Sequence, residues 1–201
     1  MKKEKVLKIL LGKMRETDIS NLDTIEQLPE IGISAKQFAL LFPNGTDEMI
    51  MDAIEYAGSQ WLECLKKNIK ETERKSEKTA LLLNSYALGA EEFSHNLSLY
   101  IDLWKIIKDG KNAYLKQRLR RIYDMYINEF SVIMNEIGTD WLNKEEIHIL
   151  GVLMTAVSDA IHIQCFTADG SVDFSQIRNF ISKLTRLMPS AFKKDEGGPY
   201  E

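Results

Sequence analysis

A short stretch after a Gly-Ile-Ser turn carries hydrogen-bonding and apolar side chains in close succession. Ser34 and Gln37 have the spacing of a helix-capping box, which predicts a short helix to about Leu41. The turn and this helix have the pattern of a helix-turn-helix motif, whose second helix presents its first exposed residues to the major groove of DNA. The candidate base-contacting residues are Ser34, Ala35, Lys36, Gln37 and Phe38.

Each of these side chains suits a different base edge. Lys36 could donate to guanine, and Gln37 could pair with adenine. Ala35 or Phe38 could contact a thymine methyl group. A second interpretation stays open, in which Gln37 only caps its helix and Phe38 fills a small core.

Contacts to the DNA backbone require hydroxyl groups and cations. Thr24 and Ser34 could hydrogen-bond phosphates, and the basic N-terminal segment offers Lys2 and Lys3. Residues 17–60, by contrast, carry eight carboxylates and a single cation. Because phosphate contacts supply most of non-specific DNA affinity, we expect weak binding unless the N-terminal lysines contribute. A solvated helix face explains those lysines equally well.

Metal chemistry is a competing hypothesis. The segments Glu92–His95 and Glu145–His148 both have the Glu-x-x-His spacing of di-iron helix bundles, which need two further inward carboxylates. Glu63 and Glu129 could nominally serve, but Glu129 and Glu145 are too close in sequence for two antiparallel helices and a turn to bring them level. Capping and the helix dipole explain Glu145. We therefore expect no metal, no cofactor and no enzymatic activity.

Aromatic side chains recur at helical spacing after residue 60. They could line an apolar cavity with a few hydrogen-bonding groups, which would suit a small hydrophobic or aromatic molecule. Singly, each is more often a core residue than a residue that lines a pocket. The candidate ligand-contacting residues are Trp61, Tyr86, Phe93, Tyr100, Trp104, Tyr123, Tyr126, Phe130 and His162.

The elements that must position these residues are all helical, because only helical periodicity appears along the chain. The expected fold class is all-α with nine helices. The first seven span about 2–16, 21–29, 35–41, 46–70, 76–95, 97–108 and 112–137. The eighth starts after Asn143 and the ninth at Asp173, with Pro189 just beyond its end. The expected domains are 1–45, which binds DNA, 46–192, which binds ligand and dimerises, and a flexible tail, 193–201.

The last two predicted helices indicate a second copy of the chain as a partner. The eighth is apolar on nearly every face and the ninth carries a narrow apolar stripe, so both need covering. A symmetric four-helix interface would cover them, although complete burial within one subunit stays an alternative. The candidate interface residues are Ile147, Leu150, Met154, Ile161, Phe174, Ile177, Ile181 and Leu184.

Composition bounds the class of protein. A charge of −4 gives no overall attraction to nucleic acid, so any DNA contact must come from a local patch. A second basic run, 105–121, is interpreted as a solvated helix face, with an acidic partner or DNA as the alternative. The N-terminus lacks a signal-peptide pattern and no segment is apolar enough to span a bilayer. We expect a cytoplasmic protein with no membrane partner.

These features together resemble the TetR family of transcription regulators. The resemblance rests on the three short N-terminal helices, the Gly-Ile-Ser turn, and the Phe-Pro pair that begins ten residues after Gly32. The sequence SDAIHIQCFTADGSVDF is similar to the family's eighth helix and the loop that follows it. The resemblance implies a homodimer joined by helices eight and nine, and DNA binding controlled by a ligand in the larger domain.

Three positions depart from the family's pattern. Ala39 stands where an aromatic residue is usual, Pro29 falls where the second helix would continue, and Asn44 with Gly45 replaces the lysine that usually follows Phe-Pro. Two hypotheses follow. The first is a TetR-like repressor that a small apolar or aromatic ligand releases from its operator. The alternative is a TetR-fold lipid- or ligand-binding accessory protein that no longer binds DNA, similar to a ubiquinone-biosynthesis family with a related Phe-Pro turn.

Overall fold

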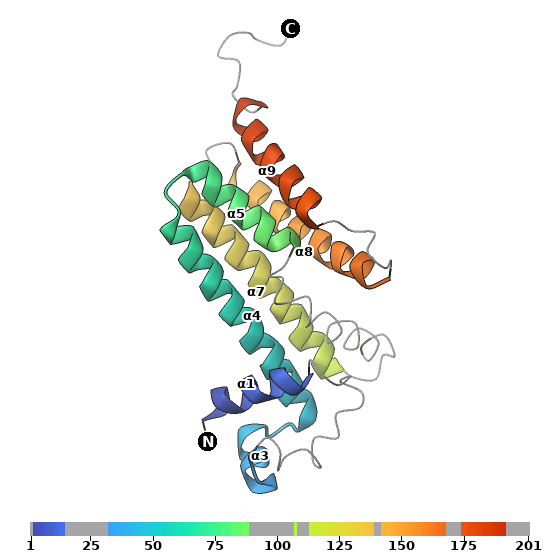
Figure 1. Ribbon diagram of the computed structural model, residues 1–201. Helices are drawn as coiled ribbons and strands as arrows, with labels where there is room; N and C mark the ends of the chain where they lie inside the picture. The colour runs from blue at the N-terminus through green and yellow to red at the C-terminus, as the bar shows by residue number, and fades with distance from the viewer. Residues whose placement is uncertain are drawn as a thin grey trace. The chain divides into compact units, whose positions relative to one another are not determined.

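The computed structural model describes residues 2–14, 32–88, 107, 113–138, 142–167 and 174–191. Regular structure in these ranges is entirely helical, which agrees with the predicted all-α class. The predicted second and sixth helices and the tail lie outside the described residues. The described helices are α1 (Lys3–Met14), α3 (Ala35–Leu41), α4 (Thr46–Glu71), α5 (Lys75–Leu88), α7 (Ala113–Ile137), α8 (Lys144–Thr167) and α9 (Phe174–Ala191) (Figure 1).

Both capping boxes predicted within these ranges are confirmed. At the start of α3, the Gln37 N–H donates to Ser34 Oγ at 3.3 Å, and the Ser34 N–H donates to Gln37 Oε1 at 2.9 Å. At the start of α8, the Glu146 N–H donates to Asn143 Oδ1 at 3.0 Å, and the Asn143 N–H donates to Glu146 Oε2 at 2.7 Å. Each pair satisfies two backbone donors that a helix N-terminus leaves without a partner.

Two predicted helix ends are wrong in detail. The position of Thr46 before Asp47 and Glu48 predicts that Thr46 is the N-cap that opens the helix 46–70, but Thr46 is already the first helical residue of α4. The Gly45 carbonyl accepts from Met49 N–H, and Gly45 has a φ of 80°, a conformation that favours glycine. The sequence also places Pro189 beyond the last helix, but α9 continues to Ala191. A proline in a last turn removes one hydrogen bond and crowds the carbonyl four residues earlier, and α9 ends two residues after it.

Packing divides the chain into two compact units. Unit 1 comprises Met1–Cys64 and Ala90–Met125, and unit 2 comprises Leu65–Gly89 and Tyr126–Glu201. The predicted division of function between 1–45 and 46–192 stays a prediction, since compact units need not coincide with functional domains. Buried residues of unit 1 include Val6, Leu10, Ile33, Phe42, Met49, Ile54, Leu115 and Ile122; those of unit 2 include Leu82, Leu83, Tyr86, Phe130, Ile133, Met134 and Ile147.

Within unit 2, α5 contacts both α8 and α9. Its buried residues include Leu82, Leu83 and Ala87. Asn84 adds a polar contact, because its Nδ2 donates to Ser182 Oγ on α9 at 3.4 Å. In the part of the chain that the structure describes, no helix combines the length and the apolar character needed to cross a membrane.

Candidate functional site

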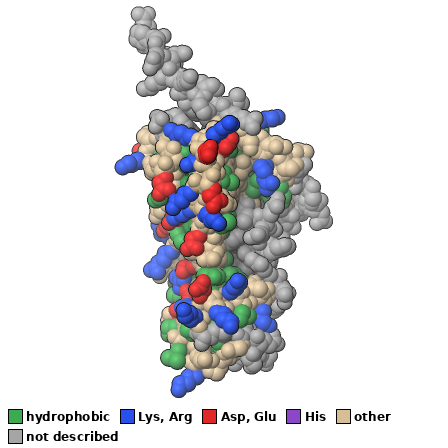
Figure 2. All heavy atoms as spheres, turned by 60° about the vertical axis from the view of Figure 1, so that its left-hand side comes forward, with side chains coloured by type: hydrophobic (Ala, Val, Ile, Leu, Met, Phe, Trp, Pro, Cys, Tyr) green, Lys and Arg blue, Asp and Glu red, His purple; other side chains and the backbone are tan. Residues whose placement is uncertain are grey.

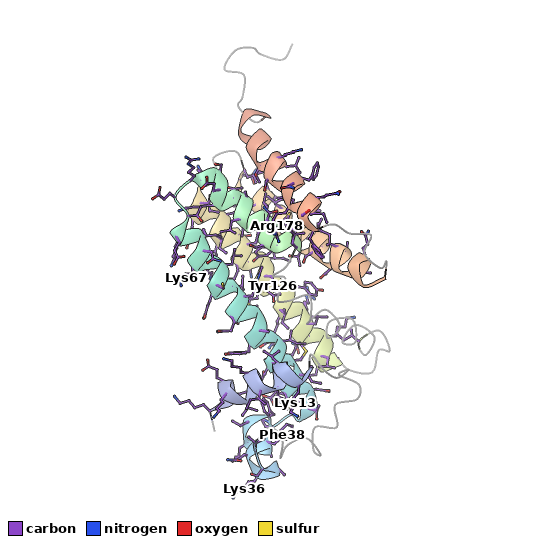
Figure 3. All side chains as sticks on the ribbon, viewed as in Figure 1. Lys13, Lys36, Phe38, Lys67, Tyr126 and Arg178 are labelled. Atoms are coloured by element: carbon purple, nitrogen blue, oxygen red, sulfur yellow. The ribbon has the colours of Figure 1, made fainter. Side chains whose placement is uncertain are left out.

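The recognition-helix candidate, α3, presents most of its surface to solvent. Ala35, Lys36, Gln37 and Ala39 are all exposed, as is the capping residue Ser34. Figure 3 labels Lys36 and Phe38, which come from this helix.

Phe38 differs from these exposed neighbours. Its side chain is half-buried, and its ring packs against that of Phe42 with centroids 5.4 Å apart. Ile33 and Phe42, on either side of α3, are both buried. The predicted base-contacting set therefore divides, because Phe38 contributes to the core while Ser34, Ala35, Lys36 and Gln37 lie at the surface.

The side chain of Gln37 is already engaged. Its carboxamide oxygen accepts from the Ser34 N–H and, at 3.2 Å, from the Ser34 hydroxyl. Pairing with adenine requires both the oxygen and the nitrogen of a carboxamide. Gln37 would have to leave the cap to make that pair, and losing a helix cap costs about 1 kcal/mol.

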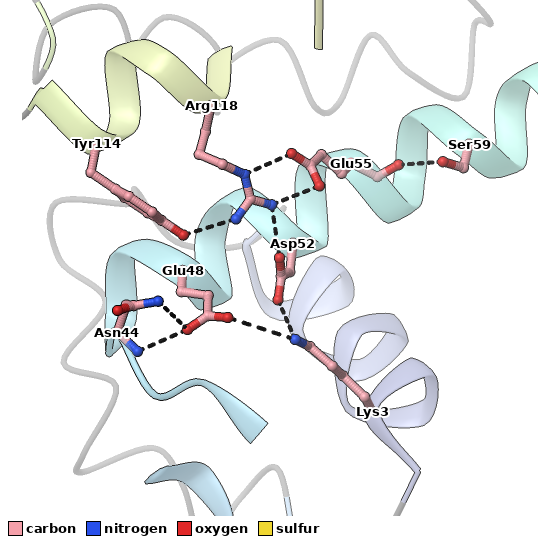
Figure 4. Close-up of polar contacts among 8 residues, drawn as sticks. All are labelled: Lys3, Asn44, Glu48, Asp52, Glu55, Ser59, Tyr114 and Arg118. Atoms are coloured by element: carbon pink, nitrogen blue, oxygen red, sulfur yellow. Dashed lines mark hydrogen bonds and ion pairs between the residues drawn. The ribbon is translucent and has the colours of Figure 1, made fainter. Parts of the chain in front are cut away.

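The acidic residues of α4 form an ion network with cations from two other helices of unit 1. Glu48, Asp52 and Glu55 recur at helical spacing and so share one face of α4. Lys3 of α1 and Arg118 of α7 both bind this face (Figure 4). We call these five residues the α4 charge cluster.

Asp52 is the shared member of the α4 charge cluster. Its Oδ2 lies 2.6 Å from Lys3 Nζ, and its Oδ1 lies 2.8 Å from Arg118 Nη2. Glu48 Oε1 is 3.9 Å from Lys3 Nζ, while Glu55 accepts from Arg118 Nε at 2.8 Å. One carboxylate therefore connects cations from α1 and α7.

Arg118 also donates from Nη1 to the phenol oxygen of Tyr114 at 2.8 Å. Burial lowers the pKa of Arg118, but the hydrogen bonds that Arg118 donates to Glu55 and Asp52 outweigh burial and raise that pKa above its ordinary value. Because its pKa is raised, the guanidinium stays charged. Its planar shape and several fixed N–H donors let it bind two carboxylates at once.

The α4 charge cluster shows that part of the negative charge of residues 17–60 is already paired with cations. Three of the eight carboxylates in residues 17–60 belong to it and are compensated within unit 1. Lys3, predicted to contact phosphate, is one of the compensating cations, and its Nζ also lies 5.0 Å from the Phe42 ring centroid. Lys5 and Lys8 are exposed on α1, and Lys2 is exposed just before it. Figure 2 shows Lys and Arg side chains interspersed with Asp and Glu along one face.

Arg118 is the site residue that sequence reasoning missed. The interpretation of the basic run 105–121 as a solvated face fits Lys116, Arg120 and Arg121, all exposed. The signal for Arg118 is present in the sequence, because buried Leu115 and Ile122 define the inward side of α7 and Arg118 lies beside them.

In unit 2, two of the predicted ligand-contacting residues are core residues. Tyr86 and Phe130 are buried, and their rings meet edge to face with centroids 5.0 Å apart. The Tyr86 hydroxyl donates to the Tyr126 backbone carbonyl at 2.8 Å. Burial, and then the charges of Tyr126 and Glu129, raise the pKa of Tyr86 above its ordinary value of 10.0. The Tyr86 phenol therefore has a structural partner in this state.

The other ligand candidates are placed differently. Tyr126 is half-buried in unit 2, and Trp61 and Tyr123 are half-buried in unit 1. His162 lies on α8, but its side chain is outside the described part, as are the residues Phe93, Tyr100 and Trp104. The described members of the predicted ligand-contacting set therefore do not form one site.

The predicted interface residues lie mainly on the inner sides of α8 and α9. Ile147 is buried inside the subunit, so we assign it to the core rather than to a partner surface. The half-buried members are Leu150, Met154, Ile161, Phe174, Ile177 and Ile181, and only Leu184 is exposed. A different apolar set is exposed on these two helices, consisting of Ile149, Val152, Leu153, Val157, Ile163, Phe180 and Leu184.

The Glu-x-x-His motifs do not form a cluster among the described residues. Glu145 and His148 are exposed near the start of α8, where the Glu145 N–H donates to Asn143 Oδ1 at 2.9 Å. The motif Glu92–His95 lies outside the described ranges. Within those ranges, no three His, Cys, Asp or Glu side chains are grouped to hold a metal ion.

The fold has solved counterparts among bacterial transcription regulators. No protein-family model and no curated protein matches the sequence. The structure of the regulator FadR from Bacillus subtilis in complex with stearoyl-CoA is similar, with a TM-score of 0.66 and 16% sequence identity over 92% of this chain and 97% of that chain.

A second similar structure is the fatty acid degradation regulator FadR from Bacillus halodurans. Its TM-score is 0.67 and its sequence identity 12%, again over 92% of this chain and 97% of that chain. At such identities the likeness shows a shared fold. The chain therefore has the all-α fold of these two regulators along nearly its whole length.

Proposed function

We propose that this protein is a homodimeric, TetR-like transcription regulator that binds duplex DNA and acts as a repressor released by a small apolar ligand. The carrying observation is the likeness to two transcription regulators over 92% of the chain. The expected cytoplasmic location and the absence of a membrane partner follow from this role.

The surface of unit 1 supports DNA binding. The α4 charge cluster compensates three carboxylates internally, while Lys2 and the α1 residues Lys5 and Lys8 are exposed, as is Lys36 of α3. In this proposal, the α1 lysines and Ser34 contact phosphates, and the exposed face of α3 contacts bases. Thr24 stays a further candidate for a phosphate contact.

The exposed apolar side chains of α8 and α9 support the homodimer. Leu153 and Phe180 are 55% and 60% exposed in the single subunit, and burying such side chains is favourable. A symmetric pairing of the two helices with their copies would cover both surfaces. Such a two-fold interface uses the same surface on both subunits, so assembly stops at the dimer. In this proposal the interface uses the exposed set, of which Leu184 also belongs to the predicted set.

An acyl-type ligand is the first candidate effector. The Bacillus subtilis regulator was solved with stearoyl-CoA, whose long hydrocarbon chain fits the expectation of an apolar ligand. Of the predicted ligand-contacting residues, Trp61 and Tyr123 are half-buried in unit 1 and stay candidates for such a contact. Ligand binding lowers operator affinity only if the ligand prefers the conformation that binds DNA less well.

A non-DNA-binding accessory protein is the second candidate function. Two observations favour it: Lys36 is the only cation of α3, and Gln37 is held in the capping box. In that case the same fold would carry a lipid without any operator.

Mobility-shift and footprinting assays with the DNA flanking its own gene separate the two candidates. The assays use the full-length protein at low and moderate salt, with and without stearoyl-CoA. A repressor gives sequence-preferring, salt-sensitive binding that the ligand weakens. No binding at low salt, together with copurifying lipid, would favour the accessory protein and contradict the regulator.

A further inference from the structure

Leu40 of α3 is the most exposed large hydrophobic side chain in the described part of the protein, at 75%. The other exposed large hydrophobic residues of that part all belong to unit 2, and most of them lie on α8 and α9. The proposed dimer interface accounts for most of that set. Among the described residues of unit 1, Leu40 is the exposed large hydrophobic one, and its place on α3 makes it a candidate for contact with a bound partner.

The neighbours of Leu40 define one face of α3. Lys36 precedes it by four residues, so the two side chains lie one turn apart on the same side. Ala39, also exposed, lies beside them. On the opposite side, half-buried Phe38 packs against Phe42. The outer face of α3 therefore offers one ammonium group, a small methyl and one large aliphatic side chain.

This face is too small for a protein partner. A stable protein interface buries roughly 800 Å² on each partner, with a cluster of apolar anchors. One leucine between a lysine and an alanine supplies no such cluster. Contact with a DNA groove needs less apolar area. The apolar group that the major groove displays is the thymine methyl, and a single aliphatic side chain can cover it.

The capping box strengthens this assignment. The carboxamide oxygen of Gln37 is held by Ser34, so the usual adenine contact cannot form while the cap is intact. Lys36 can donate to guanine or to a phosphate. Apolar contact is therefore the main chemistry left to this face for recognising an A·T pair, through the thymine methyl group.

We propose that Leu40 is a specificity-determining residue that contacts a thymine methyl group, about one helical turn along α3 from the contact made by Lys36. The inference rests on the proposed DNA-binding function and deepens it. It predicts that the operator carries a thymine at one fixed position in each half-site, recognised through its methyl group.

Uracil scanning tests this contact directly, because deoxyuridine keeps the base pairing of thymine and removes only the methyl group. An operator is first selected from random DNA with the full-length protein. Each thymine is then replaced singly, and Kd is measured for the wild-type protein and for Leu40→Ala. For wild type, we expect one thymine per half-site whose replacement weakens binding about fourfold. In Leu40→Ala, the same replacement should have no effect.

Two controls separate the possible failures. Lys36→Ala should weaken binding to every operator but keep the uracil effect, and thermal unfolding should show that Leu40→Ala is folded. Equal uracil effects in wild type and Leu40→Ala, or no uracil effect at all, would overturn the inference while leaving DNA binding intact. If the wild-type protein selects no DNA sequence, the proposed function fails and this inference fails with it.

Discussion

Arg118 binds Asp52, Glu55 and the Tyr114 hydroxyl at the same time, and its side chain is only 14% exposed. Ion pairs on the surface contribute little to stability, whereas removing one partner of a shielded pair leaves an uncompensated charge. The α4 charge cluster is shielded enough for its loss to be measurable.

The substitution Arg118→Met should therefore lower the free energy of unfolding by about 2 kcal/mol. The reason is that Glu55 would keep its charge and lose the guanidinium that it binds, and Asp52 would keep only Lys3 as a counter-charge. Arg120→Met is the matched control, since Arg120 is exposed on the same helix and should change stability by less than about 0.5 kcal/mol. Urea unfolding measures both. Equal effects would show that the cluster contributes nothing to stability.

Tyr86→Phe tests the buried phenol and its raised pKa. At pH 7 the variant should be about 1 kcal/mol less stable, since it loses the hydrogen bond to the Tyr126 carbonyl. Above pH 10 the unfolded wild type loses the Tyr86 proton first, because the folded pKa lies above 10.0. Wild-type stability then falls, and the variant has no such loss.

The measurement is urea unfolding of both proteins between pH 7 and pH 11. The stability difference between wild type and Tyr86→Phe should narrow above pH 10. A difference that stays constant over the whole range would contradict the burial of a neutral phenol.

At the residue scale, sequence patterns predicted local contacts better than distant ones. The Ser34 and Asn143 capping boxes follow from spacing within one turn, and both are confirmed. Arg118 and Asp52 are far apart in sequence, so only the packing of α7 against α4 brings them together. Composition counted the carboxylates of α4 correctly but could not show that their partners lie on α1 and α7.

At the element scale, the sequence predicted where most described helices lie, but it did not always predict which face of a helix is buried. In α8, Ile147 and Leu150 belong to the inner side, whereas Ile149 and Leu153 belong to the outer side. A helix that is apolar on nearly every face gives no sequence signal for which side meets its own subunit. The predicted interface residues are mostly half-buried, whereas the exposed apolar residues are a largely different set; which of them meets a second subunit stays a prediction.

The close approach of α8 and α7 depends on Gly151. A Cβ at this position would lie 3.1 Å from Phe130 Cδ1 and 3.3 Å from the Ile127 carbonyl oxygen. Gly151→Ala should lower the free energy of unfolding by about 1 kcal/mol, because the steric strain outweighs the gain in helix propensity.

Gly12→Ala provides the comparison for Gly151→Ala, since Gly12 lies in α1 with nothing within 4 Å of an added Cβ. This variant should gain about 0.5 kcal/mol from helix propensity alone. Thermal and urea unfolding of the two variants should therefore move in opposite directions. A stabilising Gly151→Ala would refute the close approach of α8 to α7.

At the scale of the whole molecule, the proposed dimer depends on the outer faces of α8 and α9. Leu153→Glu places a charge on this surface, and burying it in an interface would be costly, so we expect monomers. Val132→Glu is the matched control, because Val132 is an exposed apolar residue of unit 2 on α7. Sedimentation velocity should show a dimer for wild type and Val132→Glu, and a monomer for Leu153→Glu. A dimer in all three proteins would exclude this interface.

The salt dependence of operator binding tests the central claim most directly, since counterion release reports the phosphates that a protein neutralises. We predict that wild type binds DNA from its own regulatory region with an affinity that falls steeply with salt. Replacing Lys2, Lys5 and Lys8 with alanine should reduce the slope by about 0.9 for each phosphate that is no longer neutralised. An unchanged slope, or no binding by wild type at low salt, would contradict the account.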